Sequence, residues 1–161
     1  MALVVSTLTQ GLKAALQQGS YEAFSAANLQ SEAYNTYAQT VQAGVALPVF
    51  TGSEKLLLRD ALFNAYKNPN TGSAQAVGLA WYQGLQSFWG VPPVVFSAGA
   101  DTGVPVEGPT VAALVLSMGT VLSNLSNTVD SAASSMASCL DAATRGFIVT
   151  LAPSGTVVPL S

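Results

Sequence analysis

Oxygen ligands gather in one place in the chain, between Asp101 and Glu107, where Thr102 adds a hydroxyl. Two carboxylates and a hydroxyl could hold Ca²⁺ weakly, but a dedicated calcium loop alternates its oxygen ligands along the chain. The other carboxylates are scattered, as the ten-residue separation of Glu22 and Glu32 illustrates, so local spacing forms no acid–base pair. The sequence therefore defines no metal site, and we expect no metal and no other cofactor.

The residue types that most enzymes need are missing. The chain contains no histidine, the commonest general base and metal ligand and a member of the usual catalytic triad. Cys139 is its one cysteine, which excludes an intrachain disulfide and a cysteine metal cluster. It has neither a phosphate-binding glycine loop nor a G-x-S-x-G nucleophile motif. We expect that the protein is not an enzyme, and we assign no catalytic or cofactor-binding residue.

Charge is scarce for a chain of this length. Of 161 residues only 8% are charged, against about 25% in an average soluble domain, while 50% are hydrophobic. The net charge is −3 and the five basic residues form no cluster, so direct nucleic-acid binding is not expected. No apolar run approaches the roughly 20 residues of a membrane span, and no signal peptide is evident. Such a surface fits a subunit that packs against neighbours, although an alanine-rich helical domain kept soluble by hydroxyls and amides is the alternative.

Residues that mark turns and helix ends recur in the chain at a spacing of 56 residues. Glycines, an asparagine and a leucine recur at this spacing: Gly52/Gly108, Leu58/Leu114, Asn68/Asn124, Gly90/Gly146 and Gly99/Gly155. This pattern predicts two related helix–turn–helix–strand units, at 51–99 and 108–155, which we expect to superpose as copies about a pseudo-twofold axis. Together with an N-terminal helical segment at 1–45, they make one mainly α domain over 1–161, a helical bundle with a few short strands. Chance agreement between two ordinary helical hairpins is the alternative.

Two places in the helical pattern are well defined. Thr51 and Glu54 form a T-x-x-E capping box, which predicts the start of a helix. A second helix is predicted from about residue 74 to residue 89, with Trp81 and Phe88 facing the core and Trp89 covering a strand or a partner. We read the longer stretch before them, as far as Ala43, as helical.

Two short apolar runs are predicted to be strands. Residues 94–96 follow a double proline, which favours an edge strand, and 147–153 are rich in β-branched residues. The two strands either pair with each other or offer their edges to a neighbouring subunit, and we interpret 97–108 as a linker. The candidate interface residues are Pro92, Val94, Val95, Phe96, Phe147, Val149 and Leu151.

Three segments carry a resemblance to a class of proteins. The runs QSFWGVPPVVFSAG, VFTGSE and NTVDSAASSMASCLDAATRGFIVTLAP resemble small structural proteins encoded among the morphogenesis genes of tailed bacteriophages. The resemblance implies a virion subunit, made in the host cytoplasm, whose partners are other virion structural proteins and copies of itself. It favours the tail or baseplate. A capsid decoration (cement) protein and a helical adaptor or binding module outside any virion are the alternatives.

Overall fold

The computed structural model describes residues 4–18, 22–68 and 73–161. Within these residues the chain forms six α-helices and two small antiparallel sheets, which confirms the predicted mainly α fold with short strands. The helices are α1 (Val5–Gln17), α2 (Ala23–Ala38), α3 (Glu54–Tyr66), α4 (Ala74–Gly90), α5 (Leu114–Ser123) and α6 (Val129–Arg145). The strands are β1 (Leu47–Val49), β2 (Val95–Ala98), β3 (Asp101–Gly103), β4 (Pro105–Glu107), β5 (Phe147–Leu151) and β6 (Thr156–Pro159), and the 3₁₀ turn η2 (Val111–Ala113) precedes α5.

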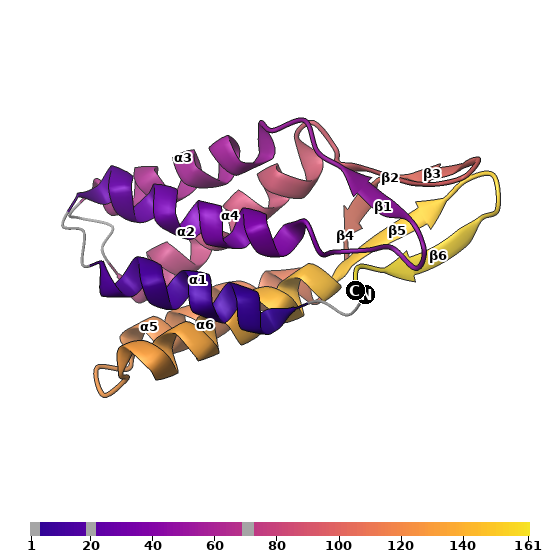
Figure 1. Cartoon of the computed structure of the whole chain (residues 1–161). Coiled ribbons are helices and arrows are strands. Elements are labelled where there is room, and N and C mark those ends of the chain that lie inside the picture. The colour runs from indigo at the N-terminus through magenta and orange to yellow at the C-terminus, as the bar shows by residue number, and fades with distance from the viewer. Residues whose placement is uncertain (1–3, 19–21, 69–72) are drawn as a thin grey trace.

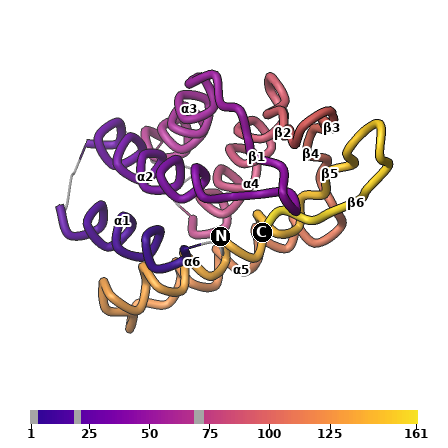
Figure 2. The backbone as a smooth tube through the Cα atoms, turned by 45° about the vertical axis from the view of Figure 1, so that its right-hand side comes forward, coloured from indigo at the N-terminus to yellow at the C-terminus, as the bar shows by residue number. Residues whose placement is uncertain are grey.

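The helices form a ring in chain order. Each helix packs against the next one along the chain, and α6 packs against α1, so that the ring closes. Figure 1 shows the helices lying side by side with all of the strands gathered at one end of the bundle. Figure 2 shows the same separation after a 45° turn, with the β2–β3 and β5–β6 hairpins extending away from the helices.

The order of elements occurs three times, once more than the sequence predicts. In each unit two helices are followed by a turn with a glycine of positive φ and then by a strand. A strand also precedes the turn in the second and third units, whereas in the first unit only the isolated bridge residue Ala43 stands there. The turn glycines are Gly44, Gly99 and Gly155, with φ of 63°, 62° and 73°, and they recur every 55 or 56 residues. The N-terminal helical segment, predicted to lie outside the two repeated units, is therefore the first copy of the same order of elements. Whether the units superpose about a symmetry axis remains a prediction.

Strand pairing joins each unit to the next. β1 pairs with β2, and β4 pairs with β5. A strand that follows the turn of one unit therefore lies against the strand that precedes the turn of the next unit. Thr102 and Ala152 exchange two N–H···O bonds of 2.9 Å, which connect the two sheets. Gln42 and Ser161 exchange two more of 2.8 Å, which return the third unit to the first. The non-local hydrogen bonds therefore run around all three units.

This pairing corrects the prediction of free strand edges. β2 lies between β1 and β3, and β5 lies between β4 and β6, so both strands are central in their sheets and do not pair with each other. The reason is that 97–108, predicted to be a linker, forms β3 and β4 and supplies the missing partners. Similarly, α2 ends at Ala38 and not near Ala43, because Ala43 turns back to bond with Ala46.

One hydrogen-bonded chain crosses the centre of the bundle. The indole N–H of Trp89 donates to the hydroxyl of Tyr34 at 2.9 Å, and that hydroxyl lies 2.7 Å from Thr144 Oγ1. Thr144 donates its own hydrogen to the carbonyl of Leu140 at 2.8 Å, so Tyr34 is the donor to Thr144. Tyr34, Trp89 and Thr144 come from α2, α4 and α6 and stand 55 residues apart. All three are fully buried, and burial raises the pKa of the Tyr34 hydroxyl well above its usual range.

The aromatic core surrounds this chain of hydrogen bonds. Trp81 and Phe88 are fully buried, as the helical spacing predicts. Trp89 is also fully buried and stacks on Phe96 of β2, with ring centroids 6.0 Å apart, so it covers a strand as predicted. Aromatic pairs of this kind add about 0.5–1.5 kcal/mol each beyond the area they bury. They tie the helices to the sheet end of the molecule.

Gly84 explains how closely α3 and α4 approach. A Cβ at this position would lie 2.5 Å from Leu58 Cδ1, which is far inside van der Waals contact. The glycine costs about 1 kcal/mol of helix propensity relative to alanine, but it lets the fully buried Leu58 pack directly on the α4 backbone. A glycine inside a helix often allows such a close approach of a neighbouring helix, and Gly84 does so here.

Glu54 holds the start of α3. Its carboxylate accepts from the backbone N–H of Thr51 and of Gly52, each at 2.8 Å, and from the Thr51 hydroxyl. The glutamate half of the predicted capping box is thus present, whereas Ser53 occupies the N-cap and makes no side-chain cap hydrogen bond. Burial disfavours the charged carboxylate, but these hydrogen bonds outweigh it and lower the pKa of Glu54 below its usual value.

The central hydrogen-bonded chain predicts a cost for removing one hydroxyl. Tyr34→Phe leaves the buried Trp89 N–H without an acceptor, so the free energy of unfolding should fall by about 1–3 kcal/mol. Tyr82→Phe is the matched control, because the Tyr82 hydroxyl lies at the partly exposed surface, and it should cost less. Urea denaturation followed by tryptophan fluorescence measures both. Equal costs in the two variants would contradict the central role of Tyr34.

The lowered pKa of Glu54 predicts a pH dependence. Glu54 stabilises the fold above its ordinary pKa of 4.5, and this contribution is lost as the pH falls through the lower folded-state value. Glu54→Gln should therefore cost about 1–2 kcal/mol at pH 7, and the gap from wild type should narrow in acid. Urea denaturation from pH 7 to pH 3 tests this, with Asp60→Asn on the exposed face of α3 as the control. A gap that stays constant with pH would count against the proposed cap.

Candidate functional site

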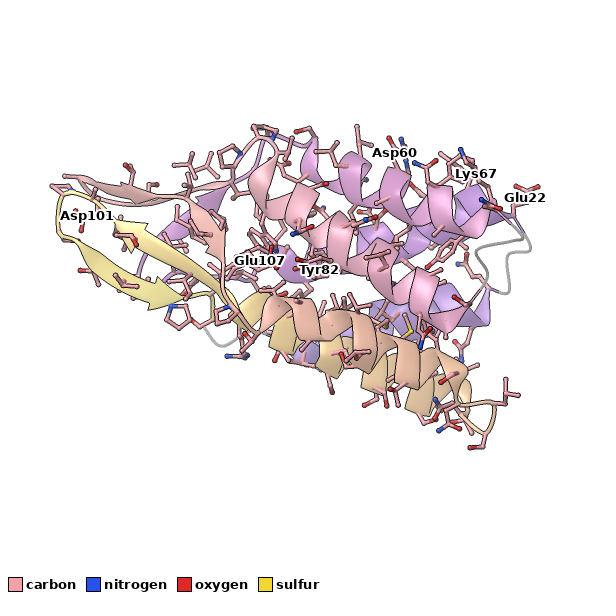
Figure 3. The ribbon with its side chains drawn as sticks, turned by 180° about the vertical axis from the view of Figure 1, so that it is seen from behind. Glu22, Asp60, Lys67, Tyr82, Asp101 and Glu107 are labelled. Atoms are coloured by element: carbon pink, nitrogen blue, oxygen red, sulfur yellow. The ribbon has the colours of Figure 1, made fainter. Side chains whose placement is uncertain are left out.

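The oxygen ligands singled out in the sequence do not come together. Asp101 Oδ1 accepts the backbone N–H of Ser154 at 3.1 Å near the hairpin tips, whereas Glu107 lies beside α4. Figure 3 shows the two carboxylates at separate places along the sheets. Within 4–18, 22–68 and 73–161, no group of three or more histidine, cysteine, aspartate or glutamate residues could hold a metal ion. The weak calcium site considered from the sequence is therefore not assembled.

Glu107 belongs to a polar cluster that the sequence does not reveal. Its Oε1 accepts from the Tyr82 hydroxyl and its Oε2 from Gln86 Nε2, both at 2.6 Å. The hydrogen bond to the carboxylate raises the pKa of Tyr82, and partial burial and the negative charge act in the same direction. The cluster joins β4 to α4 (Figure 3). Spacings of 21 and 25 residues give no local signal by which to find it.

The grooves between helices are open and lined mainly by small side chains. One lies between α1 and α2 and includes Gly11 and Ala33. Another lies between α5 and α6, where the half-buried Cys139 is flanked by Ser117 and Ala142. The groove between α1 and α2 also has polar side chains in its lining, among them Gln10 and Glu32. The outer face of the sheets has a different character.

Two rows of aliphatic side chains cover that outer face. The first aliphatic row consists of Leu47 and Val49 of β1 and Val95 of β2, where Val49 and Val95 are directly paired across the strands. The second aliphatic row consists of Val106 of β4, Ile148 of β5 and Pro159 of β6, which lie side by side, with Val157 next to them. Val49 is 56% exposed and Val106 is 64% exposed. Large aliphatic groups thus face outward on both sheets.

The candidate interface residues divide between this face and the core. Pro92 and Val95 are exposed. The other candidates are at most 4% exposed and belong to the core: Val94, Phe96, Phe147, Val149 and Leu151. The sequence analysis thus placed core residues in the interface. It missed most of the outward members, because an apolar residue stands on both faces of β5, as Phe147 and Ile148 illustrate.

The sheet end carries almost no charge. Segments 39–53 and 146–161, which contain β1, β5 and β6, have no charged residue. All five basic residues lie in α1, α3 or α6 or directly after α3. The carboxylates of Asp101 and Glu107 on β3 and β4 accept hydrogen bonds within the chain. The outer face therefore presents aliphatic groups to solvent without charges to hydrate it.

No protein-family model matches the chain, and comparisons with curated proteins and with solved structures give no significant match. In the part of the chain that the structure describes, no helix is both long enough and apolar enough to span a bilayer. The exposed aliphatic rows and the lack of charge at the sheet end are the features that bear on function.

The assignment of inward and outward positions predicts opposite effects for two valines on neighbouring strands. Val106→Lys places its charge in solvent, so the free energy of unfolding should change by about 0.5 kcal/mol or less. Val149→Lys places the same charge at a fully buried position and should cost more than about 4 kcal/mol or prevent folding. Urea denaturation or, for a variant that does not fold, circular dichroism gives the comparison. Similar effects at both positions would show that the outer face is wrongly assigned.

Proposed function

We propose that this protein is a structural subunit of a tailed-bacteriophage virion, placed in the tail or baseplate, and that it assembles through the outer face of its sheets. The resemblance of its QSFWGVPPVVFSAG, VFTGSE and NTVDSAASSMASCLDAATRGFIVTLAP segments to phage morphogenesis proteins supports the virion role. Its low charge and the absence of histidine support a structural role over a catalytic one.

The observation that carries the proposal is the aliphatic outer face. An antiparallel sheet with one face in water normally alternates between apolar inward and polar outward residues. Here the outward positions of the first and second aliphatic rows are themselves aliphatic and substantially exposed. Exposed apolar patches of this kind mark surfaces that other proteins cover. A subunit in a particle would bury them against its neighbours.

The strand pairing defines how a neighbour can bind. Because β2 and β5 are hydrogen-bonded on both sides, a neighbouring chain cannot add a strand to either of them. The outer strands of the two sheets have one strand partner each. The exposed aliphatic side chains favour contact through the outer face of the sheets, side chain against side chain. The proposed contact is therefore between sheet faces, whereas the sequence suggested contact between strand edges.

Incorporation into particles tests the proposal. Val95→Lys and Thr150→Lys, both at outward strand positions, should lower the number of copies per particle while leaving the free energy of unfolding nearly unchanged. Ser134→Lys, on the exposed face of α6, is the control and should be incorporated normally. The phage gene is replaced by each variant, and quantitative mass spectrometry of purified particles counts the copies.

The location of the chain in the particle distinguishes a tail or baseplate subunit from a capsid decoration protein and from a free adaptor. Immunogold labelling at the tail or baseplate agrees with the proposal, and labelling over the head would indicate a decoration protein instead. A stable protein that is absent from purified particles would contradict the virion role and favour a free helical adaptor.

A further inference from the structure

We propose that the two aliphatic rows are complementary docking faces for copies of this same chain, the first row of one copy covering the second row of the next. The inference depends on the proposed role as an assembling subunit, and it names the partner and the direction of assembly. The first row is Leu47, Val49 and Val95, on β1 and β2. The second row is centred on Val106 and Ile148, on β4 and β5, and it extends onto β6.

Both rows are built to be covered. Each row crosses neighbouring antiparallel strands, where directly opposite side chains lie about 4.5–5.5 Å apart and form a continuous apolar surface. Leu47 is 54% exposed, Val95 is 40% exposed and Ile148 is 36% exposed in the isolated chain. The inward faces of β2 and β5 hold the core residues Phe96, Phe147 and Val149, so the central strand of each sheet is apolar inside and carries an exposed aliphatic residue outside. Strands that are apolar on both sides are typical of sheets with both faces buried.

The charge distribution selects another copy of this chain as the occupant. An uncharged aliphatic row is best covered by a surface that is also uncharged, because a charged partner would lose hydration without gaining an ion pair. The chain carries such a surface itself, in its other row. The net charge of −3 does not oppose the contact, because the charged residues outside β3 and β4 all lie on the helices or next to them. Two copies therefore approach with least repulsion through their sheet ends.

Other classes of partner fit the rows poorly. A membrane surface is bound by apolar residues flanked by lysine and arginine, and neither is present in 68–144 or 146–161. Nucleic acid needs clustered basic residues and is disfavoured for the same reason. A peptide that adds a strand binds at a sheet edge, and it would leave the aliphatic rows on the outer face uncovered.

The repeated architecture makes the assembly head-to-tail. The β1–β2 and β4–β5 pairs are equivalent junctions, each between one unit and the next, and they stand at successive positions around the ring. The rows differ in width, because the first covers two strands and the second covers three. A copy that uses both rows touches two neighbours through different surfaces. Contacts of this kind close into a ring or continue as a filament.

A mixing experiment tests both the occupant and the direction. Val49→Lys disables the first row and Val106→Lys disables the second, so each purified variant should sediment as a monomer of 16.4 kDa, while the wild type forms larger species. When the two variants are mixed, the intact first row of one meets the intact second row of the other. The mixture should therefore form a one-to-one dimer of twice the monomer mass and grow no further. Ser134→Lys should assemble like the wild type.

The alternative outcomes overturn the inference in distinguishable ways. Variants that dimerise on their own and ignore each other would show contact between like rows. A wild type that stays monomeric at every concentration would exclude a second copy as the occupant. If the row variants were nevertheless lost from particles, the proposed virion role would stand, with a different protein covering the rows. If particles took them up normally, the chain would still be a virion subunit, but contact through the aliphatic rows would be excluded.

Discussion

The structure depends on the hydrogen-bonded chain from Trp89 through Tyr34 to Thr144. Each of these residues comes from the second helix of a different unit, and each is fully buried. In such an environment an unpaired donor costs about 1–3 kcal/mol, so the three helices are stable only in the register that satisfies the chain. The aromatic side chains around it, including Phe88 and Phe96, then link this register to the sheet.

The same arrangement determines what the surface can do. Strands of neighbouring units pair with each other. As a result β2 and β5, whose edges the sequence suggested as contact sites, are hydrogen-bonded to other strands of the same chain. Free edges are a common route to uncontrolled aggregation, and this fold limits that route. What remains for a partner is the outer face of the sheets, where Val49 and Val106 are more than half exposed. Binding through such a face is governed by shape and apolar burial.

Local features of the fold could be predicted from the sequence. The core positions of Trp81 and Phe88 follow from helical spacing, the start of α3 from Glu54, and the close packing at Gly84 from the absence of a side chain. The strand FIVTL follows from its β-branched residues. Each of these depends on neighbours within a few positions along the chain.

The long-range features could not be predicted. The first helix of the first unit does not keep the 56-residue spacing, because α1 begins at Val5 and α3 at Glu54, and this hides the third copy of the plan. The pairing of Gln42 with Ser161 joins two distant parts of the chain and leaves no local signal. The inward face of β5 is also not encoded locally, because Phe147 and Ile148 are both apolar, and only the finished sheet shows that Phe147 is buried.

A cryo-electron microscopy reconstruction of the assembled particle, at a resolution that separates strands, tests the central claim most directly. The account predicts that neighbouring chains cover Val49 and Val106, with more than about 1,000 Å² buried at each subunit contact. A particle in which the chain is present with both rows facing solvent, held by its helices alone, would contradict it.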